Sequence, residues 1–355
     1  MSDTALHTKP FIQVAAGLIL RPDGALLLGQ RPADKPWPGW WELPGGKLEP
    51  GETPLQALAR ELKEELDITV THATPWVTYT HEYPKNIVCL NFCKVTGWTG
   101  EPRGMENQQL AWVNPEMPPD VGPLLPATEP PMRWLRVPNR YLLSSIGSPE
   151  HLPAFLERLR QALQNGLRLV QFREPAWPQG VDDPGLEAAL AQVVALCHAH
   201  QARCLVNSIH PQRWWALADG VHLRASDALA WTQGRAGSPA SAESPTQSMA
   251  RESHYGHAQP HPALGLKSDH WLAVSAHTEQ ELAAARTLNA NFVVVGHVLQ
   301  TPSHPNEQPL GWKGFEALAH QAGLPVLAIG GQSQATLAQA EQHGAHGIAG
   351  IRYLT

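Results

Sequence analysis

Eight short apolar segments, all of them after residue 139, constrain the fold of this chain more than any other feature. They are Tyr141–Ile146, Leu167–Phe172, Arg203–Val206, Gly220–Leu223, Trp271–Val274, Phe292–Val295, Val326–Ile329 and Gly347–Ile351. Helical patterns separate most of them, at Pro149–Asn165, Gly185–His200, Glu279–Leu288, Gly314–Gln321 and Gln334–His343. Strands that alternate with helices in this number predict a closed (β/α)8 TIM barrel. A Rossmann-like open sheet is the alternative, but no Gly-x-Gly-x-x-Gly sequence follows the first strand.

The sequence before the barrel is predicted to form a domain of its own, because 355 residues are too many for one ordinary core. Strand-like segments at Ile12–Leu20 and Ala25–Leu28 flank a Pro-Asp-Gly turn at Pro22–Gly24. A Pro-rich connector, Arg136–Asn139, ends this part. We therefore expect an α/β and α+β two-domain protein, with domains at residues 1–136 and 137–355.

A segment of low complexity interrupts the barrel at about residues 232–262. It is rich in Ser, Ala, Gly, Gln, Pro and His and contains few large apolar side chains. Such a composition does not bury enough surface to order the chain, so we expect a disordered insertion in the loop after the fourth strand. Its His254, His257 and His261 offer metal ligands, although solvated loop histidines are the commoner interpretation.

The composition limits the classes of function. Apolar residues make up 43% of the chain and charged residues 16%, which is typical of globular proteins. The formal net charge of −6 argues against a polyanion binder, so we expect no direct DNA binding. No apolar run reaches the ~18 residues that a membrane helix needs, and Met1–Pro10 lacks the apolar core of a signal peptide. The cysteines are too few and scattered for a disulfide framework, so we expect a cytoplasmic protein.

The most informative stretch of the N-terminal part runs from Gly46 to Ile68 and contains one amphipathic helix. Thr53 suits the N-cap, Pro54 the first helical position and Gln56 the reciprocal position of a capping box. The apolar residues at helical spacing are expected to form the buried stripe: Leu55, Leu58, Ala59, Leu62 and Leu66.

Three carboxylates, those of Glu61, Glu64 and Glu65, recur at i, i+3 and i+4 on one patch of this helix. Such like charges repel one another, and a hard divalent cation relieves the repulsion. Mg2+ is the expected cofactor, with Mn2+ as an alternative, because these ions prefer oxygen ligands and are shared with substrate phosphates. Arg60 is placed to hold one carboxylate through a bidentate pair. A solvated acidic helix face is the competing interpretation of the carboxylates alone.

The whole stretch resembles the Nudix box, Gly-x5-Glu-x7-Arg-Glu-U-x-Glu-Glu-x-Gly-U, in which U is a bulky aliphatic residue. The matching positions are Gly46, Glu52, Arg60, Glu61, Leu62, Glu64, Glu65 and Ile68. The one departure is Asp67, where the family has a glycine at the end of the helix. A positive φ is expected there, and Asp tolerates it better than most residues do, so we expect intact chemistry.

The resemblance extends from about Val14 to Leu135 and is strongest to the MutT-type 8-oxo-dGTP diphosphatases, which remove oxidised nucleotides from the pool used for DNA replication. It implies a mixed sheet between helices. It also implies substrate contacts from Arg31, Glu42, Leu43, Pro44, Gly45 and Thr128. The implied metal ligands are Gly45, through its carbonyl, and Glu61, Glu64 and Glu65; the implied catalytic residues are Arg60, Glu61, Glu64 and Glu106. Which of these glutamates is the general base stays open.

In the implied reaction, water attacks an inner phosphorus of a nucleoside triphosphate and pyrophosphate leaves, while Arg31 stabilises phosphate charge. The family has Asn at the position of Thr128 to recognise the oxidised guanine edge. A hydroxyl offers a shorter and less directional contact than an amide, so the base preference is open. Trp37, Trp40 and Trp41 lie near the loop, where stacking on a base is one role and packing the commoner one.

The barrel part offers a phosphate site at Gly330 and Gly331, because glycines after the seventh strand of such barrels commonly form a phosphate cradle. Ordinary turn glycines are the alternative. Over Tyr141–Ile351 the sequence resembles thiamine phosphate synthase and its TenI-like relatives. The resemblance rests on Val170–Arg173, Val206–Asn207, Asp219–Leu223, Val274–His277, Val295–Val298, Thr301–Ser303 and Ala328–Gly331.

The catalytic positions of that second family are the ones that depart. Pro175 and His304 stand where the family has lysines that bind pyrophosphate. Ser208 replaces a magnesium-binding aspartate, and only Asp227 remains of the second acidic motif. With so little to neutralise pyrophosphate, the barrel is expected to make thiamine phosphate inefficiently and to bind a small phosphate ligand or act as a scaffold.

Four functions follow from these patterns. The first is a magnesium-dependent hydrolase of nucleoside triphosphates, with 8-oxo-dGTP as the expected substrate. The second uses the same site on another nucleotide or on a thiamine-pathway diphosphate. The third is a transferase centred on the barrel, against which the altered barrel residues argue. The fourth is a binding module without catalysis, against which the intact glutamates argue.

Overall fold

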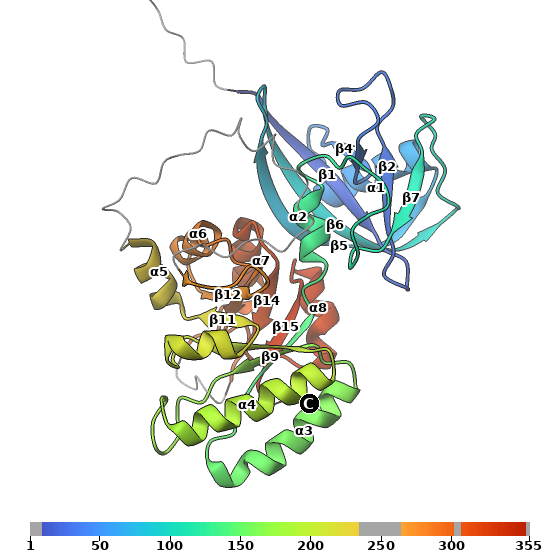
Figure 1. Cartoon of the computed structure of the whole chain (residues 1–355). Helices are drawn as coiled ribbons and strands as arrows, with labels where there is room; N and C mark the ends of the chain where they lie inside the picture. The colour runs from blue at the N-terminus through green and yellow to red at the C-terminus, as the bar shows by residue number, and fades with distance from the viewer. Residues whose placement is uncertain (1–8, 234–263, 302–306, 353–355) are drawn as a thin grey trace, which may run out of the picture. The chain divides into compact units, whose positions relative to one another are not determined.

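The computed structural model describes residues 9–233, 264–301 and 307–352 of the chain. The chain divides into two compact units, Met1–Met132 and Arg133–Thr355 (Figure 1). The first is a mixed α+β unit and the second is a closed eight-stranded barrel. This confirms the fold class that the sequence predicts and excludes the open Rossmann-like sheet.

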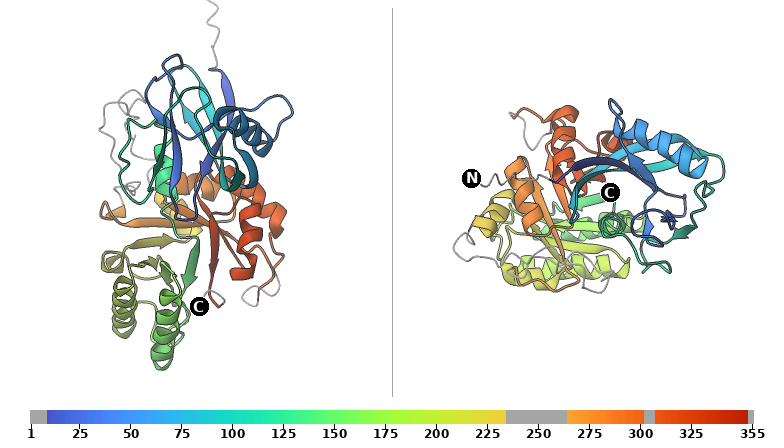
Figure 2. Two further views of the ribbon diagram at one scale, coloured as in Figure 1. Left: turned by 90° about the vertical axis from the view of Figure 1, so that its right-hand side faces the viewer. Right: turned by 90° about the horizontal axis from the view of Figure 1, so that it is seen from above.

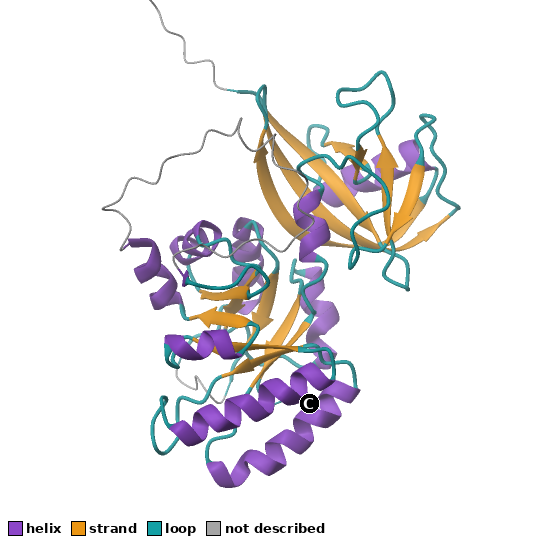
Figure 3. Ribbon diagram, viewed as in Figure 1, coloured by secondary structure: helices purple, strands orange, loops and turns teal. Residues whose placement is uncertain are grey.

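Two sheets form the framework of the first unit (Figure 3). Its strands are β1 (Phe11–Ile19), β2 (Leu26–Gln30), β3 (Trp41–Glu42), β4 (Gly45–Lys47), β5 (Thr69–Glu82), β6 (Ile87–Thr99) and β7 (Leu110–Val113). One sheet has the order β4-β1-β6-β5, in which β1 is parallel to β6 and antiparallel to β4. The other sheet, β3-β2-β7, is antiparallel. The expected turn between β1 and β2 is present, and Gly24 adopts a φ of 85° there.

Helix α1 (Pro54–Leu66) packs Leu58, Leu62 and Leu66 into the core of the first unit, as expected. The prediction for the rest of its stripe was wrong, because Ala57 is buried whereas Leu55 and Ala59 are exposed. On a helical wheel Ala57 and Ala59 lie on opposite flanks of the leucine row, whereas Leu55 lies in line with the row but in the first turn of the helix. Spacing alone does not decide which flank faces the sheet.

The end of α1 agrees with the expectation for its unusual residue. Asp67 caps the helix with φ 55° and ψ 27°, which is the left-handed region, and its backbone N–H donates to the carbonyls of Leu62 and Lys63. The side chain of Asp67 also pairs with Lys63. Asp therefore takes the conformation that the family's glycine would adopt, and the helix ends in the same way.

The second unit is a barrel of parallel strands surrounded by helices (Figure 2). The strands are β8 (Arg140–Leu143), β9 (Leu169–Phe172), β10 (Arg203–Asn207), β11 (Gly220–Leu223), β12 (Trp271–Ala276), β13 (Phe292–Gly296), β14 (Val326–Ile329) and β15 (Gly347–Gly350). The helices are α3 (Leu152–Gln164), α4 (Pro184–Ala199), α5 (Ala225–Gln233), α6 (Glu279–Thr287), α7 (Gly311–Ala322) and α8 (Leu337–Gln342), with a short α2 (Glu129–Trp134) before the first strand. Each predicted barrel strand is present, and the observed ends differ from the predicted ones by a few residues at most.

The structure corrects the predicted position of the insertion at its start. Thr232, predicted to begin it, is part of α5, so the low-complexity segment follows that helix rather than the fourth strand directly. Residues 234–263 lie outside the described part of the chain, and so do His254, His257 and His261. Among the residues that are described, no helix is both long and apolar enough to cross a membrane.

Candidate functional site

Helix α1 fixes the directions of the acidic side chains of the first unit. Its first turn is closed by the expected capping box, in which Thr53 and Gln56 bond reciprocally and Pro54 opens the helix. Glu61 lies four residues after Ala57 and three after Leu58, so it faces the buried side of the helix. The Glu61 and Glu65 side chains are accordingly only 16% and 19% exposed, whereas that of Glu64 is 60% exposed.

Two glycines of β4 make room for these carboxylates. A Cβ atom on Gly46 would lie 2.2 Å from the carboxylate carbon of Glu61, and one on Gly45 would lie 2.1 Å from the carbonyl oxygen of Ala15. Gly45 also has a φ of 141° and donates its backbone N–H to Oε2 of Glu65, at 3.1 Å. The two glycines therefore bring the β4 backbone directly against the acidic face of α1.

Arg60 holds the acidic side chains in an ordered arrangement. Its Nε and Nη2 atoms donate to the two carboxylate oxygens of Glu52, each at 2.9 Å, and Nη2 also donates to the carbonyl of Lys47 at 3.1 Å. Its Nη1 atom donates to Glu61 at 3.0 Å and to Glu64 at 3.4 Å. The hydrogen bonds from Arg60 and from the backbone of Glu49 lower the pKa of Glu52 to about 2. Arg60 thus forms its bidentate pair with Glu52 and not with a carboxylate of the Glu61, Glu64 and Glu65 patch, and it contacts Glu61 through one nitrogen only.

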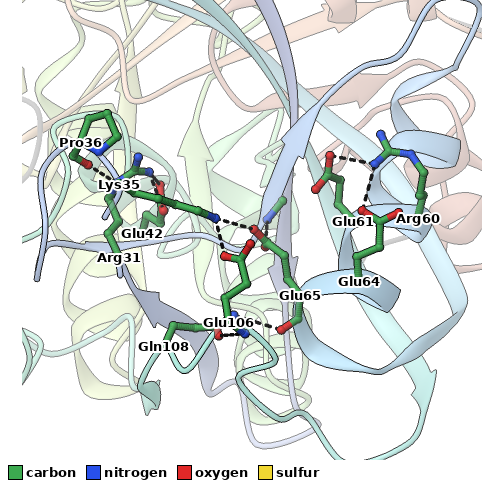
Figure 4. A network of polar contacts seen from close by, with 11 residues as sticks. Arg31, Lys35, Pro36, Glu42, Arg60, Glu61, Glu64, Glu65, Glu106 and Gln108 are labelled. Carbon is green, nitrogen blue, oxygen red and sulfur yellow. Dashed lines mark hydrogen bonds and ion pairs between the residues drawn. The ribbon is translucent and has the colours of Figure 1, made fainter. Parts of the chain in front are cut away.

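Glu65 and Glu106 form a second acidic group, beside Lys35 (Figure 4). Lys35 donates to Glu106, and its Nζ atom lies 3.9 Å from Oε1 of Glu65. Burial, with smaller contributions from the charges of Glu106 and Glu61, raises the pKa of Glu65 to about 7. Burial of Lys35 lowers the pKa of its ammonium group, but the hydrogen bond to Glu106 and the charges of nearby carboxylates outweigh burial, so that this pKa is raised. Burial therefore favours the protonated form of Glu65 more strongly than the nearby lysine and the Gly45 N–H favour its charged form.

The loop that carries Glu106 is held on the end of α1 by Gln108. The Nε2 atom of Gln108 donates to the carbonyl of Glu65 at 3.0 Å, and its Oε1 atom accepts from the backbone N–H of Glu106 at 2.8 Å. The backbone N–H of Met105 bonds to the same Glu65 carbonyl at 3.0 Å. Sequence reasoning found Glu106 but missed Lys35 and Gln108, whose partners lie far away along the chain.

Arg31 lies against Glu42 in this structure. Its Nη1 atom donates to both oxygens of Glu42, at 2.6 and 2.5 Å, and its Nε atom donates to the carbonyl of Pro36 at 2.6 Å. Burial, which the Arg31 charge only partly offsets, raises the pKa of Glu42. The predicted phosphate contact of Arg31 stays a prediction, because here its guanidinium is committed to these two acceptors.

The remaining predicted substrate residues are buried in the same region. Leu43 and Thr128 are buried, and the carbonyl of Pro44 accepts from the N–H of Gly17 at 2.8 Å. Sequence reasoning missed Tyr83, whose pKa is raised to about 12 by burial and by the charge of Glu42, and which forms a backbone hydrogen bond with Ala127. Tyr83 therefore lies between Glu42 and the segment that carries Thr128.

The three tryptophans of the loop separate into two kinds. Trp41 belongs to β3 and is buried, so it packs in the core. The rings of Trp37 and Trp40 meet edge to face with their centroids 5.0 Å apart, and both are partly exposed. Stacking on a base thus stays open for Trp37 and Trp40 alone.

The donor chemistry of this site fits a hard divalent cation. The carboxylates of Glu61 and Glu65 lie against the β4 glycines, and Lys35 lies between Glu65 and Glu106; carboxylate oxygens and backbone carbonyls are the ligands that Mg2+ prefers. In this structure Arg60 contacts the carboxylates of Glu52, Glu61 and Glu64, whereas Lys35 contacts those of Glu65 and Glu106. Across the described ranges, no three His, Cys, Asp or Glu side chains converge closely enough to hold an ion as they stand. Binding an ion therefore requires side-chain rotations at Glu61, Glu64 and Glu65.

The interior of the barrel contains a ring of hydrogen-bonded polar side chains. Gln171 donates to the Tyr141 hydroxyl at 3.1 Å and lies 2.6 Å from Nδ1 of His222. Nε2 of His222 lies 2.8 Å from the Ser275 hydroxyl, and Asn207 donates to Gln171 at 3.1 Å. Burial, with a smaller effect of a nearby arginine charge, lowers the pKa of His222 to about 3, so this imidazole is neutral at pH 7. The ring joins β8, β9, β10, β11 and β12.

The predicted barrel glycines have the backbone conformation of a tight loop. Gly330 and Gly331 follow β14 with φ values of 97° and 68°. A Cβ on Gly330 would lie 2.5 Å from Cβ of His297, and one on Gly331 would lie 2.7 Å from Cβ of Leu299. Glycine is therefore required at both positions for close packing, which agrees with the turn interpretation as well as with a phosphate cradle.

Comparison with known proteins divides the chain in two. The model of the NUDIX domain matches residues 10–135, and the model named thiamine monophosphate synthase matches residues 143–238 and 261–354. An 8-oxo-dGTP diphosphatase of Haemophilus influenzae is 44% identical over 105 residues, which cover 30% of this chain and 77% of that protein. A CTP pyrophosphohydrolase of Escherichia coli is 41% identical over 119 residues, which cover 34% of this chain and 87% of that protein. A thiamine-phosphate synthase of Synechococcus is 28% identical over 208 residues, which cover 59% of this chain and 50% of that protein.

Proposed function

Because the chain belongs to the Nudix family through residues 10–135 and to the thiamine monophosphate synthase family through residues 143–238 and 261–354, we propose that its first unit hydrolyses nucleoside triphosphates to monophosphates and pyrophosphate. One observation carries the proposal. The acidic face of α1 lies against the Gly45–Gly46 backbone, where Arg60 orders Glu61 and the Gly45 N–H holds Glu65. A polyphosphate shared with a metal ion is the ligand that such a surface fits.

The metal-binding groups would be the carbonyl of Gly45 and the carboxylates of Glu61, Glu64 and Glu65. Bound Mg2+, or Mn2+ in its place, supplies neutralisation of phosphate charge and a water of lowered pKa. The chain's own contribution is orientation, since Arg60 fixes Glu61 and the Gly45 N–H fixes Glu65. Arg31 reaches the phosphates when it leaves Glu42, and its charge stabilises the leaving pyrophosphate.

Among the candidates for the general base, Glu64 is favoured over Glu61 and Glu106. Its carboxylate is 60% exposed and its contact with Arg60 is the longest that this arginine makes, at 3.4 Å. Glu61 is held more tightly by Arg60, and Glu106 pairs with Lys35. A base that accepts a proton from an attacking water has to reach that water without first breaking a strong ion pair.

The proposed substrate is 8-oxo-dGTP, and the proposed role is removal of this oxidised nucleotide from the pool. Two similar proteins act on different bases according to their names, one on 8-oxo-dGTP and the other on CTP. Thr128 and Tyr83 are the groups of this chain that would meet the base. A hydroxyl at position 128 discriminates less sharply than an amide, so the second candidate substrates are pyrimidine triphosphates.

The test is a substrate panel on the full chain: 8-oxo-dGTP, dGTP, CTP and thiamine diphosphate, each with Mg2+, with Mn2+ and with EDTA. We expect metal-dependent release of pyrophosphate, fastest from 8-oxo-dGTP. Glu64→Gln and Glu65→Gln should each lose nearly all activity while the unfolding transition is kept. Glu116→Gln, at an exposed position outside the site, is the matched control. Absence of cleavage of every nucleotide in the panel would refute the proposal.

A second function is proposed for the barrel, namely binding of a small phosphate ligand without efficient synthesis of thiamine phosphate. It is favoured by the Gly330–Gly331 turn and by Arg173, a half-buried arginine at the end of β9. An assay with the two thiamine precursors tests the catalytic half of this proposal. Turnover at ordinary enzyme rates would mean that the barrel is an active transferase after all.

A further inference from the structure

Asp227 is the one acidic residue that the barrel retains of the second family's metal-binding motif, and it is fully occupied by its neighbours. Nε of Arg224 donates to Oδ2 of Asp227 at 2.8 Å, and Nη2 donates to Oδ1 at 3.0 Å. The Ser208 hydroxyl donates to Oδ2 at 2.5 Å and accepts from the backbone N–H of Arg224 at 2.9 Å. Both carboxylate oxygens are therefore engaged by donors of the chain itself.

A divalent cation does not fit this arrangement. The guanidinium of Arg224 already neutralises Asp227 through a bidentate pair, and Ser208 offers only a neutral hydroxyl where a second carboxylate would be needed. Within the described part of the chain, no cluster of three His, Cys, Asp or Glu side chains is present that would serve instead. The magnesium ion that the resemblance to thiamine phosphate synthase implies here therefore does not fit the residues of this chain.

Arg173 supplies a second positive charge at the same end of the barrel. It follows β9 directly, and burial together with the charge of Arg224 lowers the pKa of its guanidinium, while Glu174 acts in the opposite direction. In the ranges that the structure describes, its guanidinium has no hydrogen-bond acceptor and no ion pair. An arginine guanidinium carries five donors in a planar fork, which matches phosphate geometry.

The other charged and titratable groups around Arg173 do not supply that acceptor. The carboxylate of Glu174 is buried and accepts from the Ser144 hydroxyl and from the backbone N–H groups of Ile146 and Gly147. The charge of Arg173 helps to lower the pKa of His210 and His222, after the larger effect of burial, so both imidazoles favour the neutral form. The arginine thus lies among neutral or already satisfied groups.

We propose that the barrel mouth binds a phosphate monoester without a divalent cation, with Arg173 as the direct ligand and the Arg224–Asp227 pair in place of a metal ion. This inference rests on the phosphate-binding function proposed above for the barrel. Arg224 keeps its Nη1 atom outside the bidentate pair and its side chain is 49% exposed, so it can donate to the phosphate while it holds Asp227. The held guanidinium of Arg224 therefore supplies a hydrogen-bond donor where a metal would coordinate the phosphate, and Arg173 supplies the net positive charge.

The experiment is a calorimetric titration of the full chain with inorganic phosphate, once in EDTA and once in Mg2+. The expected result is binding in EDTA with an affinity within about twofold of that in Mg2+. Arg173→Gln should weaken the binding in EDTA on the order of tenfold to a hundredfold, the range for loss of charged hydrogen bonds. Arg158→Gln, on the exposed face of α3, should leave it unchanged.

Arg224→Gly separates the two roles of the pair. Removal of the guanidinium should abolish binding in EDTA and, because Asp227 is released, make the remaining binding dependent on Mg2+. Far-ultraviolet circular dichroism and urea denaturation of the full chain report whether the barrel of these variants stays folded. Wild-type binding that appears only with Mg2+ would overturn the metal-free inference and leave the phosphate-binding proposal standing. Absence of binding under both conditions would overturn both. Full binding by Arg173→Gln would overturn the inference that Arg173 is the direct ligand and leave the phosphate-binding proposal standing.

Discussion

A single missing methyl group decides whether Glu61 keeps its position. Gly46→Ala would place a Cβ atom 2.2 Å from the Glu61 carboxylate carbon, so the carboxylate has to move away from the β4 backbone. We expect kcat to fall at least about 100-fold, because displacements near 1 Å have effects of that size. The variant should still fold, since Gly46 does not have a positive φ. Steady-state kinetics and a thermal melt measure the two effects.

The matched control for this substitution is Gly29→Ala. A Cβ atom there would meet only the side chain of Leu110, at 3.7 Å, which is an ordinary contact. This variant should retain most of the activity. If Gly46→Ala were as active as Gly29→Ala, the close approach of Glu61 to the β4 backbone would not matter for catalysis.

His222 gives the barrel a stability that depends on pH in a known direction. Burial lowers its pKa from 6.5 to about 3, so the unfolded chain binds a proton that the folded chain does not within that range. The stabilising contribution is complete above pH 6.5 and is lost as the pH falls toward 3. His222→Gln should therefore reduce the slope of unfolding free energy against pH by up to about 1.4 kcal/mol per unit.

Urea denaturation of the second unit at several pH values measures that slope. His320→Gln, at an exposed position of α7, is the comparison that also removes one imidazole. Equal slopes for His222→Gln and the wild type would show that this imidazole takes up its proton alike in the folded and unfolded chains.

Local spacing predicted some of the site residues and could not reveal others. The directions of Glu61 and Glu65 follow from their distances to Leu58 and Leu62 along one helix, and Thr53 and Gln56 follow from capping chemistry. Lys35 bonds to Glu106 across 71 positions, and Gln108 bonds to Glu65 across 43. No periodicity marks such contacts, because they arise only when the sheets bring loops together.

At the scale of elements, the loop around Glu106 depends on one amide side chain. Gln108→Ala removes its hydrogen bonds to the Glu65 carbonyl and the Glu106 N–H, each of which contributes about 1 kcal/mol. We expect faster hydrogen exchange at the Glu106 amide and a fall in kcat of roughly tenfold, since Glu106 is then less well positioned.

The neighbouring Gln109 provides a close control, because its side chain is exposed and its backbone carbonyl accepts from the N–H of Gln30. In Gln109→Ala, hydrogen exchange at the Glu106 amide and kcat should both match those of the wild type. Unchanged exchange at the Glu106 amide in Gln108→Ala would mean that the backbone contacts alone hold this loop.

The barrel strands could be predicted because almost every residue in them is buried, so that each is a short and mainly apolar run. Gly220–Leu223 and Val326–Ile329 were predicted with the observed ends. Helix α5 was not predicted, and its weak signal has a physical reason: Ala228 is its one buried residue, so it shows no clear apolar stripe. In α1 the leucine row was clear, but the flank that faces the sheet depends on tertiary packing.

At the scale of the whole molecule, each proposed site is built entirely from residues of one compact unit. Glu64 belongs to the first unit, and Arg173 and Arg224 belong to the second. Arg224→Gln should therefore leave kcat/KM for 8-oxo-dGTP within about twofold of the wild type, and Glu64→Gln should leave phosphate affinity in EDTA equally unaffected. Coupled sites typically change each other's ligand affinity by about 5- to 150-fold, which these measurements resolve easily. A mutual change in that range would mean that the two units share a conformational equilibrium, and the fusion would then have a regulatory consequence instead of joining two independent activities.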